Sequence, residues 1–180
     1  MTPRAIILDR AGVVNHDSDD YIKSPDEWVP IPGSLEAIGA LSRAGYRVFI
    51  VSNQSGLGRG LFDQAALEAM HAKMARLSAV HGGRIEAVYY CPHAPEQDCD
   101  CRKPLPGLFR RLATDTGLDL TGVPAVGDSL RDLRAAAAAG ARPILVRTGK
   151  GREAEARLDD GTVPVYDDLA AAVRELLAAD

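Results

Sequence analysis

The chain has 180 residues, 46% of them hydrophobic and 26% charged, which is enough apolar material for one globular core. A formal net charge of −4 argues against the broad positive surface with which proteins bind nucleic acid. No apolar run approaches about 18 residues and the N-terminal stretch lacks a signal-type segment, so we expect a soluble, cytoplasmic protein without a membrane partner.

Short β-branched runs alternate with helical patterns, which is typical of a parallel sheet covered by helices. The pattern predicts strands at 5–9, 47–53, 86–91, 124–128 and 142–148, and a short edge strand at 164–166. Helices are predicted at 34–44, 63–80, 106–116, 129–139 and 167–179. We therefore expect an α/β, Rossmann-like three-layer sandwich with a central parallel sheet, as a single domain over 1–180 and a monomer.

Several helices carry start signals. Asp63 and Asp167 fit N-cap positions, and Pro106 fits the first position of a helix. Ser129 and Asp132 have the spacing of a capping box.

Polar side chains follow three of the predicted strands. Asp9, the stretch Ser52–Ser55 and Asp128 each come at a carboxyl end. One such residue would be read as an ordinary helix cap, but in a parallel sheet these ends share one edge, where ligands bind. Three together predict a site.

The residue types at this edge suit phosphoryl transfer. Asp9 could attack phosphorus as a carboxylate nucleophile. Repulsion between two anions then requires a hard cation such as Mg²⁺, for which Asp9 and Asp128 could supply oxygen ligands. Lys103 and the Ser52 hydroxyl could hold the remaining phosphoryl oxygens.

The three cysteines crowd into one short segment with a histidine. Cys91, His93, Cys99 and Cys101 form the pattern C-x-H-x5-C-x-C, which matches the Cys₃His ligand set of structural Zn²⁺. The alternatives are a disulfide or free thiols. We favour a zinc-binding loop over residues 91–101, because the stretch is rich in Pro and Asp and could hardly order itself by packing.

Taken in order, four motifs resemble those of the haloacid dehalogenase superfamily: LDRAG with Asp9, SNQS with Ser52, RKP with Lys103 and GDSLRD with Asp128. The resemblance spans nearly the whole chain. It implies that Asp9, Ser52 and Lys103 are catalytic and that Mg²⁺ is held by Asp9, Asp128 and the backbone carbonyl of Ala11. Asp132 would either support Lys103 or the metal, or cap its helix.

The position two residues after the nucleophile departs from the family pattern. The superfamily's phosphatases have a second aspartate there, which protonates the leaving alcohol, and this chain has Ala11. Three interpretations stay open: an engineered change, a natural relative in which water, His16 or Asp17 takes over, or altered chemistry of the kind found in phosphonate-cleaving relatives. The last would need a large helical cap, for which the chain has no room.

The cysteine loop sharpens the resemblance to a zinc-bearing subgroup with a minimal cap, which includes heptose bisphosphate phosphatases and histidinol phosphatases. It implies hydrolysis of the 7-phosphate of a D-glycero-D-manno-heptose 1,7-bisphosphate, in the assembly of ADP-heptose for lipopolysaccharide, impaired by Ala11. The alternatives are a histidinol phosphatase or other small phosphate-ester phosphatase, and a non-catalytic sugar-phosphate binding module.

The same resemblance implies a set of substrate contacts. They are Asp17, Asp20, Tyr21, Ser52, Asn53, Gln54, Ser55, Arg102 and Lys103. Arg102 is a forked donor suited to a second phosphate. We expect Arg59 to be solvated and His71 and His81 to be exposed.

Overall fold

The computed structural model describes residues 4–159 and 161–180. A six-stranded sheet runs through it in the order β3-β2-β1-β4-β5-β6, and every neighbouring pair is parallel. Its strands are β1 (Arg4–Leu8), β2 (Tyr46–Asn53), β3 (Ile85–Cys91), β4 (Pro124–Gly127), β5 (Arg142–Val146) and β6 (Val165–Tyr166). All six predicted strands are present, with ends that differ by one or two residues.

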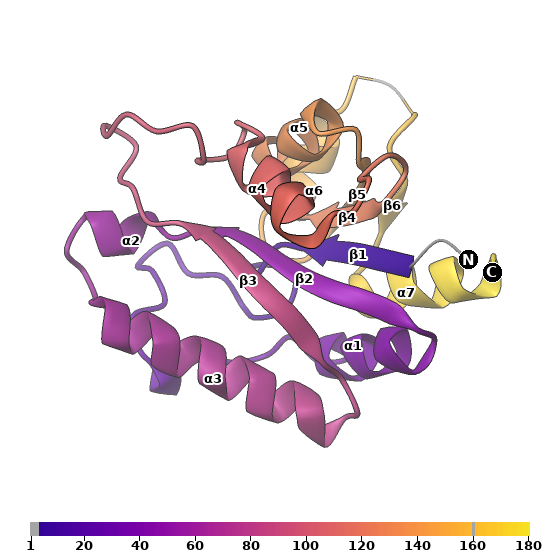
Figure 1. The fold of residues 1–180 in the computed structure, drawn as a ribbon, viewed down its shortest axis with the longest axis horizontal. Helices are drawn as coiled ribbons and strands as arrows, with labels where there is room; N and C mark the ends of the chain where they lie inside the picture. The colour runs from indigo at the N-terminus through magenta and orange to yellow at the C-terminus, as the bar shows by residue number, and fades with distance from the viewer. Residues whose placement is uncertain (1–3, 160) are drawn as a thin grey trace.

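Helices cover both faces of the sheet and complete a three-layer sandwich (Figure 1). One face carries α1 (Ser34–Arg43), α3 (Gln64–Val80) and α7 (Leu169–Ala178), and the other carries α4 (Gly107–Thr116), α5 (Leu130–Ala138) and α6 (Gly151–Ala156). The short helices η1 (Pro25–Glu27), α2 (Ser55–Gly58) and α6 were not predicted from the sequence. All three are six residues or shorter, too short for an amphipathic period to stand out.

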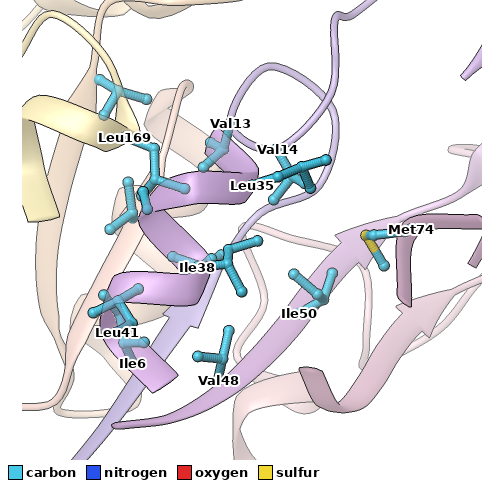
Figure 2. Close-up of a cluster of buried hydrophobic side chains, with 14 of the residues drawn as sticks. Ile6, Val13, Val14, Leu35, Ile38, Leu41, Val48, Ile50, Met74 and Leu169 are labelled. Carbon is cyan, nitrogen blue, oxygen red and sulfur yellow. The ribbon is translucent and has the colours of Figure 1, made fainter. Parts of the chain in front are cut away.

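Alternate side chains of each central strand point to opposite faces. In β1, Ile6 packs in the cluster under α1 whereas Ile7 packs under α4 and α5. Figure 2 shows the first cluster, in which Leu35, Ile38 and Leu41 of α1 lie against strand residues such as Val48. Because of this two-residue period, a single strand contributes side chains to both halves of the core.

Two of the four predicted helix-start signals are correct. Asp63 accepts a hydrogen bond from the backbone N–H of Ala66, and Ser129 forms the capping box with Asp132. Two predictions were off by one residue. Asp168, not Asp167, caps α7, and Pro106 precedes the first residue of α4 instead of occupying it. Both alternatives fit the same local pattern, and only the path of the entering chain decides between them.

The sheet order reverses between β1 and β4. From β1 the chain moves outward to β2 and β3, and from β4 it moves the other way to β5 and β6. The helices after β1 and β4 therefore diverge, which opens a crevice at the carboxyl ends of these two strands. No helix in the described ranges is long and apolar enough to cross a membrane.

Candidate active site

Three acidic side chains meet at this crevice. Asp9 follows β1, Asp128 follows β4, and Asp132 lies in the first turn of α5. Each offers a carboxylate oxygen, and these oxygens all lie within 4.8 Å of one another. A cluster this close suits a small divalent cation, since hard cations prefer oxygen ligands.

Lys103 is the cation of this group. It comes from the loop after β3 and is buried, and its Nζ lies 3.1 Å from Asp9 Oδ1 and 2.9 Å from Asp132 Oδ1. A third hydrogen bond goes to the carbonyl of Val51. Burial lowers the pKa of Lys103, but Asp132 and Asp9 together raise it above its ordinary value, so the lysine is charged at neutral pH.

Asp132 fulfils both roles considered for it. One carboxylate oxygen binds Lys103, and the other accepts hydrogen bonds from the N–H of Asp128, the N–H of Ser129 and the Ser129 hydroxyl. With both oxygens engaged, Asp132 joins the lysine to the turn that carries Asp128. Burial raises its pKa, but Lys103 outweighs burial and lowers the pKa below its usual value.

The other two carboxylates lack enough positive charge around them. Burial, reinforced by Asp132, raises the pKa of Asp9 to about 6, although Lys103 opposes the shift. Burial and the charges of Asp9 and Asp132 raise the pKa of Asp128 to about 9. A divalent cation between Asp9 and Asp128 would reverse both shifts by stabilising the ionised forms.

Two glycines bring the backbone against Asp128. Gly12 and Gly149 both have positive φ, and a Cβ built on either would collide with Asp128 Oδ2. The same oxygen accepts a hydrogen bond from the N–H of Lys150 at 3.0 Å, and the Thr148 hydroxyl donates to the carbonyl of Gly12 at 2.6 Å. The segments after β1 and β5 therefore fix this carboxylate from both sides.

The SNQS motif positions the catalytic candidates. The side chain of Asn53 accepts from the N–H of Lys103 at 3.0 Å and donates to the carbonyl of Lys103 at 3.3 Å. Gln54, which is buried, donates to the Ser52 hydroxyl at 2.8 Å. The amides of Asn53 and Gln54, predicted to contact substrate, thus have partners within the protein.

A cavity of about 300 Å³ lies above these residues. All but one of the predicted substrate contacts line it, together with Asp9, Ala11 and Asp128. The exception is Asp20. Arg59, expected to be solvated, is exposed but also borders the cavity.

The cavity wall also contains residues that were not predicted, among them Arg10, Ser129, Arg131 and Lys150. Arg10 directly follows Asp9 in the LDRAG motif, and Arg131 lies within GDSLRD. These positions in the motifs could have indicated that both residues border the site. The cavity wall combines the acidic cluster with several cations, which suits an anionic ligand bound through a metal.

The four predicted zinc ligands converge on one point. The thiols of Cys91 and Cys99 are 3.8 Å apart, and His93 Nδ1 lies 3.3 Å from the sulfurs of Cys91 and Cys101. Tetrahedral Zn²⁺ with ordinary bond lengths spaces two thiolates by about 3.8 Å and a thiolate and imidazole nitrogen by about 3.6 Å. All three cysteines are free, so the disulfide alternative is not formed.

Without a cation, the thiolate forms of the cysteines in this loop are disfavoured. Burial and the neighbouring thiols raise the pKa of Cys101, and burial likewise raises the pKa of Cys91. Packing several would-be thiolates together is unfavourable unless a cation shares them. The loop can therefore hold a metal ion two residues before Lys103.

Two family models match the chain: polynucleotide kinase 3 phosphatase over residues 5–129, and a HAD-hydrolase-like model over residues 100–172. Among curated proteins, the chain is 56% identical over 176 residues to the D-glycero-β-D-manno-heptose-1,7-bisphosphate 7-phosphatase of Bordetella bronchiseptica, covering 97% of this chain and 98% of that one. The Pseudomonas aeruginosa protein of the same name is 52% identical over 178 residues, covering 98% and 99%.

Solved structures of heptose bisphosphate phosphatases also resemble this chain. The crystal structure of D,D-heptose 1,7-bisphosphate phosphatase from B. bronchiseptica, complexed with magnesium and phosphate, superposes with a TM-score of 0.96 at 54% identity and covers 98% of this chain and 99% of that one. The corresponding phosphatase from Burkholderia thailandensis gives a TM-score of 0.77 at 46% identity, covering 97% and 99%.

Proposed function

The chain belongs to the haloacid dehalogenase superfamily and, within it, to the family of D-glycero-β-D-manno-heptose-1,7-bisphosphate 7-phosphatases, and on that premise we propose that it hydrolyses the 7-phosphate of this heptose bisphosphate. The reaction supplies a step in ADP-heptose assembly for lipopolysaccharide. The observation that carries the proposal is the meeting of Asp9, Asp128 and Lys103 at one cavity.

Asp9 is the nucleophile. One of its carboxylate oxygens forms a bond to phosphorus while the bond from phosphorus to the sugar oxygen breaks, and the alcohol leaves with a proton. Water then cleaves the aspartyl phosphate, which returns the carboxylate and releases inorganic phosphate. The hydrogen bond from Lys103 to Asp9 Oδ1 supports this role, since it fixes one oxygen and leaves the other for attack.

Mg²⁺, bound by Asp9, Asp128 and the Ala11 carbonyl, would neutralise negative charge between nucleophile and phosphate. Lys103 and the Ser52 hydroxyl hold phosphoryl oxygens as charge redistributes. Gln54 supports the Ser52 role, because its N–H donates to the hydroxyl oxygen at 2.8 Å, whereas the hydroxyl donates a long hydrogen bond of 3.4 Å to the carbonyl of Asn53, which a phosphate oxygen would replace.

Ala11 slows the chemistry without removing the site. A positioned acid/base typically contributes about 10²–10⁴-fold, and an alanine methyl cannot transfer a proton. Of the two substitutes considered, Asp17 lines the cavity whereas His16 lines a neighbouring hollow. We assign residual proton transfer to water or Asp17.

The sugar and its second phosphate extend toward the cavity rim. Arg102 follows the last cysteine of the loop directly, and its Nη1 is buried without a hydrogen-bond partner among the described residues. A phosphate oxygen would satisfy it as a charge-assisted acceptor. Tyr21 lines the same cavity, on a backbone with positive φ that a non-glycine residue adopts at a cost of about 1–3 kcal/mol.

The metal of the cysteine loop is zinc. Its Cys₃His donors match the softness and the tetrahedral spacing that Zn²⁺ prefers, and four protein ligands leave no open position, which makes the role structural. Holding Cys101 fixes the backbone from which Arg102 and Lys103 extend.

Steady-state phosphate release with Mg²⁺ tests the function directly. We expect turnover of the heptose 1,7-bisphosphate to exceed that of histidinol phosphate, and Asp9→Asn to abolish it. A preference for histidinol phosphate would reassign the substrate. Ala11 motivates the alternative that the chain only binds sugar phosphates, and the variant Ala11→Asp tests this alternative. We expect the variant to raise kcat by about 10²–10⁴-fold. If neither chain turned over the substrate, binding alone would be favoured.

A further inference from the structure

Arg10, next to the proposed nucleophile Asp9, is a buried cation that forms no direct ion pair in the part of the chain that the structure describes. It is 2% exposed and borders the cavity. Its Nη1 lies 3.3 Å from His71 Nε2, and its Nε has no hydrogen-bond partner within residues 4–159 and 161–180. Among the residues that the structure describes, no ion pair includes Arg10, although a buried charge is ordinarily paired.

The partner, His71, belongs to α3 and is neutral. The prediction that it is exposed was wrong, because it lies half-buried against the ring of Tyr90 with centroids 6.1 Å apart. Burial and then the charge of Arg10 lower the pKa of His71 to about 4. At neutral pH the ring therefore carries one proton, and with Nε2 facing an obligate donor that proton is on Nδ1.

A neutral acceptor differs from a carboxylate in what it does to the charge of Arg10. It orients the guanidinium through a hydrogen bond but cancels none of its positive charge. The acidic groups that act on Arg10 are Asp9 and Asp17, both in the cavity wall. Neither carboxylate forms an ion pair with Arg10 among the described residues, and in a site of low dielectric a cation without a direct ion pair attracts an incoming anion strongly.

We propose that His71 is a positioning residue for the phosphatase reaction, which holds Arg10 at the cavity wall through a neutral acceptor so that the charge of Arg10 acts on the anionic substrate. The inference rests on the proposed function. His71 does not touch the reacting atoms and acts only through Arg10.

The variants His71→Gln and His71→Glu test this, because the two side chains have the same shape and differ in charge. Gln keeps a neutral acceptor, so we expect its KM for the bisphosphate within about twofold of the unaltered chain. Glu forms an ion pair with Arg10, and we expect its KM to be on the order of tenfold higher. The kcat values should agree within about threefold. Equal KM values for the two variants would overturn the proposal.

His81→Gln and His81→Glu provide the matched control. His81 caps the same helix ten residues further on, about 15 Å away along its axis, and pairs with Glu36. This separation exceeds the screening length of about 8 Å at physiological salt, so the control pair should show no KM difference. If the KM difference between the Gln and Glu variants were equal at His71 and His81, the effect would come from the net charge of the protein, and the proposal would be wrong.

A binding measurement separates this inference from the proposed function. Calorimetric titration with inorganic phosphate and Mg²⁺ needs no turnover, and circular dichroism establishes that each variant is folded. If the chain fails on the heptose bisphosphate but phosphate binds the Gln variant about tenfold more tightly than the Glu variant, the inference stands and the substrate is reassigned. Equal phosphate affinities, or no phosphate binding to the unaltered chain, would refute it.

Discussion

Replacing Lys103 by Met should destabilise the protein strongly at neutral pH. The substitution keeps the unbranched shape of the side chain, shortens it by its terminal atom and removes its charge, so Asp132 Oδ1 loses its partner and Asp9 loses a 3.1 Å contact. Removing one member of a buried ion pair typically costs about 3–5 kcal/mol. That is a large part of the roughly 5–15 kcal/mol by which a domain of this kind is stable.

The loss should shrink at lower pH. Without Lys103, the buried carboxylates keep their protons to higher pH, so the folded variant binds more protons than its unfolded chain and stability rises as pH falls. If one carboxyl pKa moves above 7.5, lowering the pH from 7.5 to 5.5 restores up to about 2.7 kcal/mol. In the unaltered chain Lys103 lowers the pKa of Asp132, so Asp132 adds no such gain in this window.

Urea unfolding at pH 7.5 and 5.5 measures both quantities. Lys23→Met is the control, since Lys23 is partly exposed and its contact with Glu27 is 3.7 Å, a pair worth about 0–1 kcal/mol. We expect the Lys103 variant to fall short of the unaltered chain by several kcal/mol at pH 7.5 and by less at pH 5.5. A deficit below 1 kcal/mol, or one that does not change with pH, would refute the electrostatic reasoning.

Three further outcomes are expected. The affinity for Mg²⁺, measured by calorimetry, should rise from pH 7 to 9, because Asp128 with a pKa of about 9 must lose its proton to bind; a flat profile would contradict this. Elemental analysis should find one zinc per chain. The variant Cys101→Ser should lose this zinc, and its segment 91–101 should become sensitive to protease. Zinc retained by the variant would argue against the proposed ligand set. Asn53→Ala should lower kcat by about tenfold with a small change in melting temperature, because it frees the backbone of Lys103; a change in KM alone would instead favour direct substrate contact.

The fold and the acidic cluster were predictable because their signals are local. Strands such as β2 (Tyr46–Asn53) can be recognised by their β-branched runs, and parallel strands bring their carboxyl ends to one edge of the sheet. Asp9, Asp128 and Lys103 could therefore be assigned to one site from three separate stretches of sequence. The convergence of Cys91, His93, Cys99 and Cys101 into a cluster that could hold a metal ion was predictable for the same reason, since all four lie within residues 91–101.

The contacts that the sequence analysis missed depend on side-chain directions between distant elements. Nothing near His71 reveals that α3 turns it toward Arg10, 61 residues earlier. Asn53 was assigned to substrate because it sits in a motif, whereas its amide reaches the backbone of Lys103, 50 residues later. Arg131 lies in the first turn of a helix, and only the packing of that helix decides whether it meets the cavity.

The main chain that encloses Asp128 limits how this protein can vary. Gly12 and Gly149 bear no functional group, yet each leaves only enough room for the carboxylate beside it. A single methyl at either place would push the acid away from the end of β4 and spoil the spacing to Asp9. Two residues without side chains are thus among the least replaceable in the molecule, and a screen for lost function should recover them as readily as Asp9.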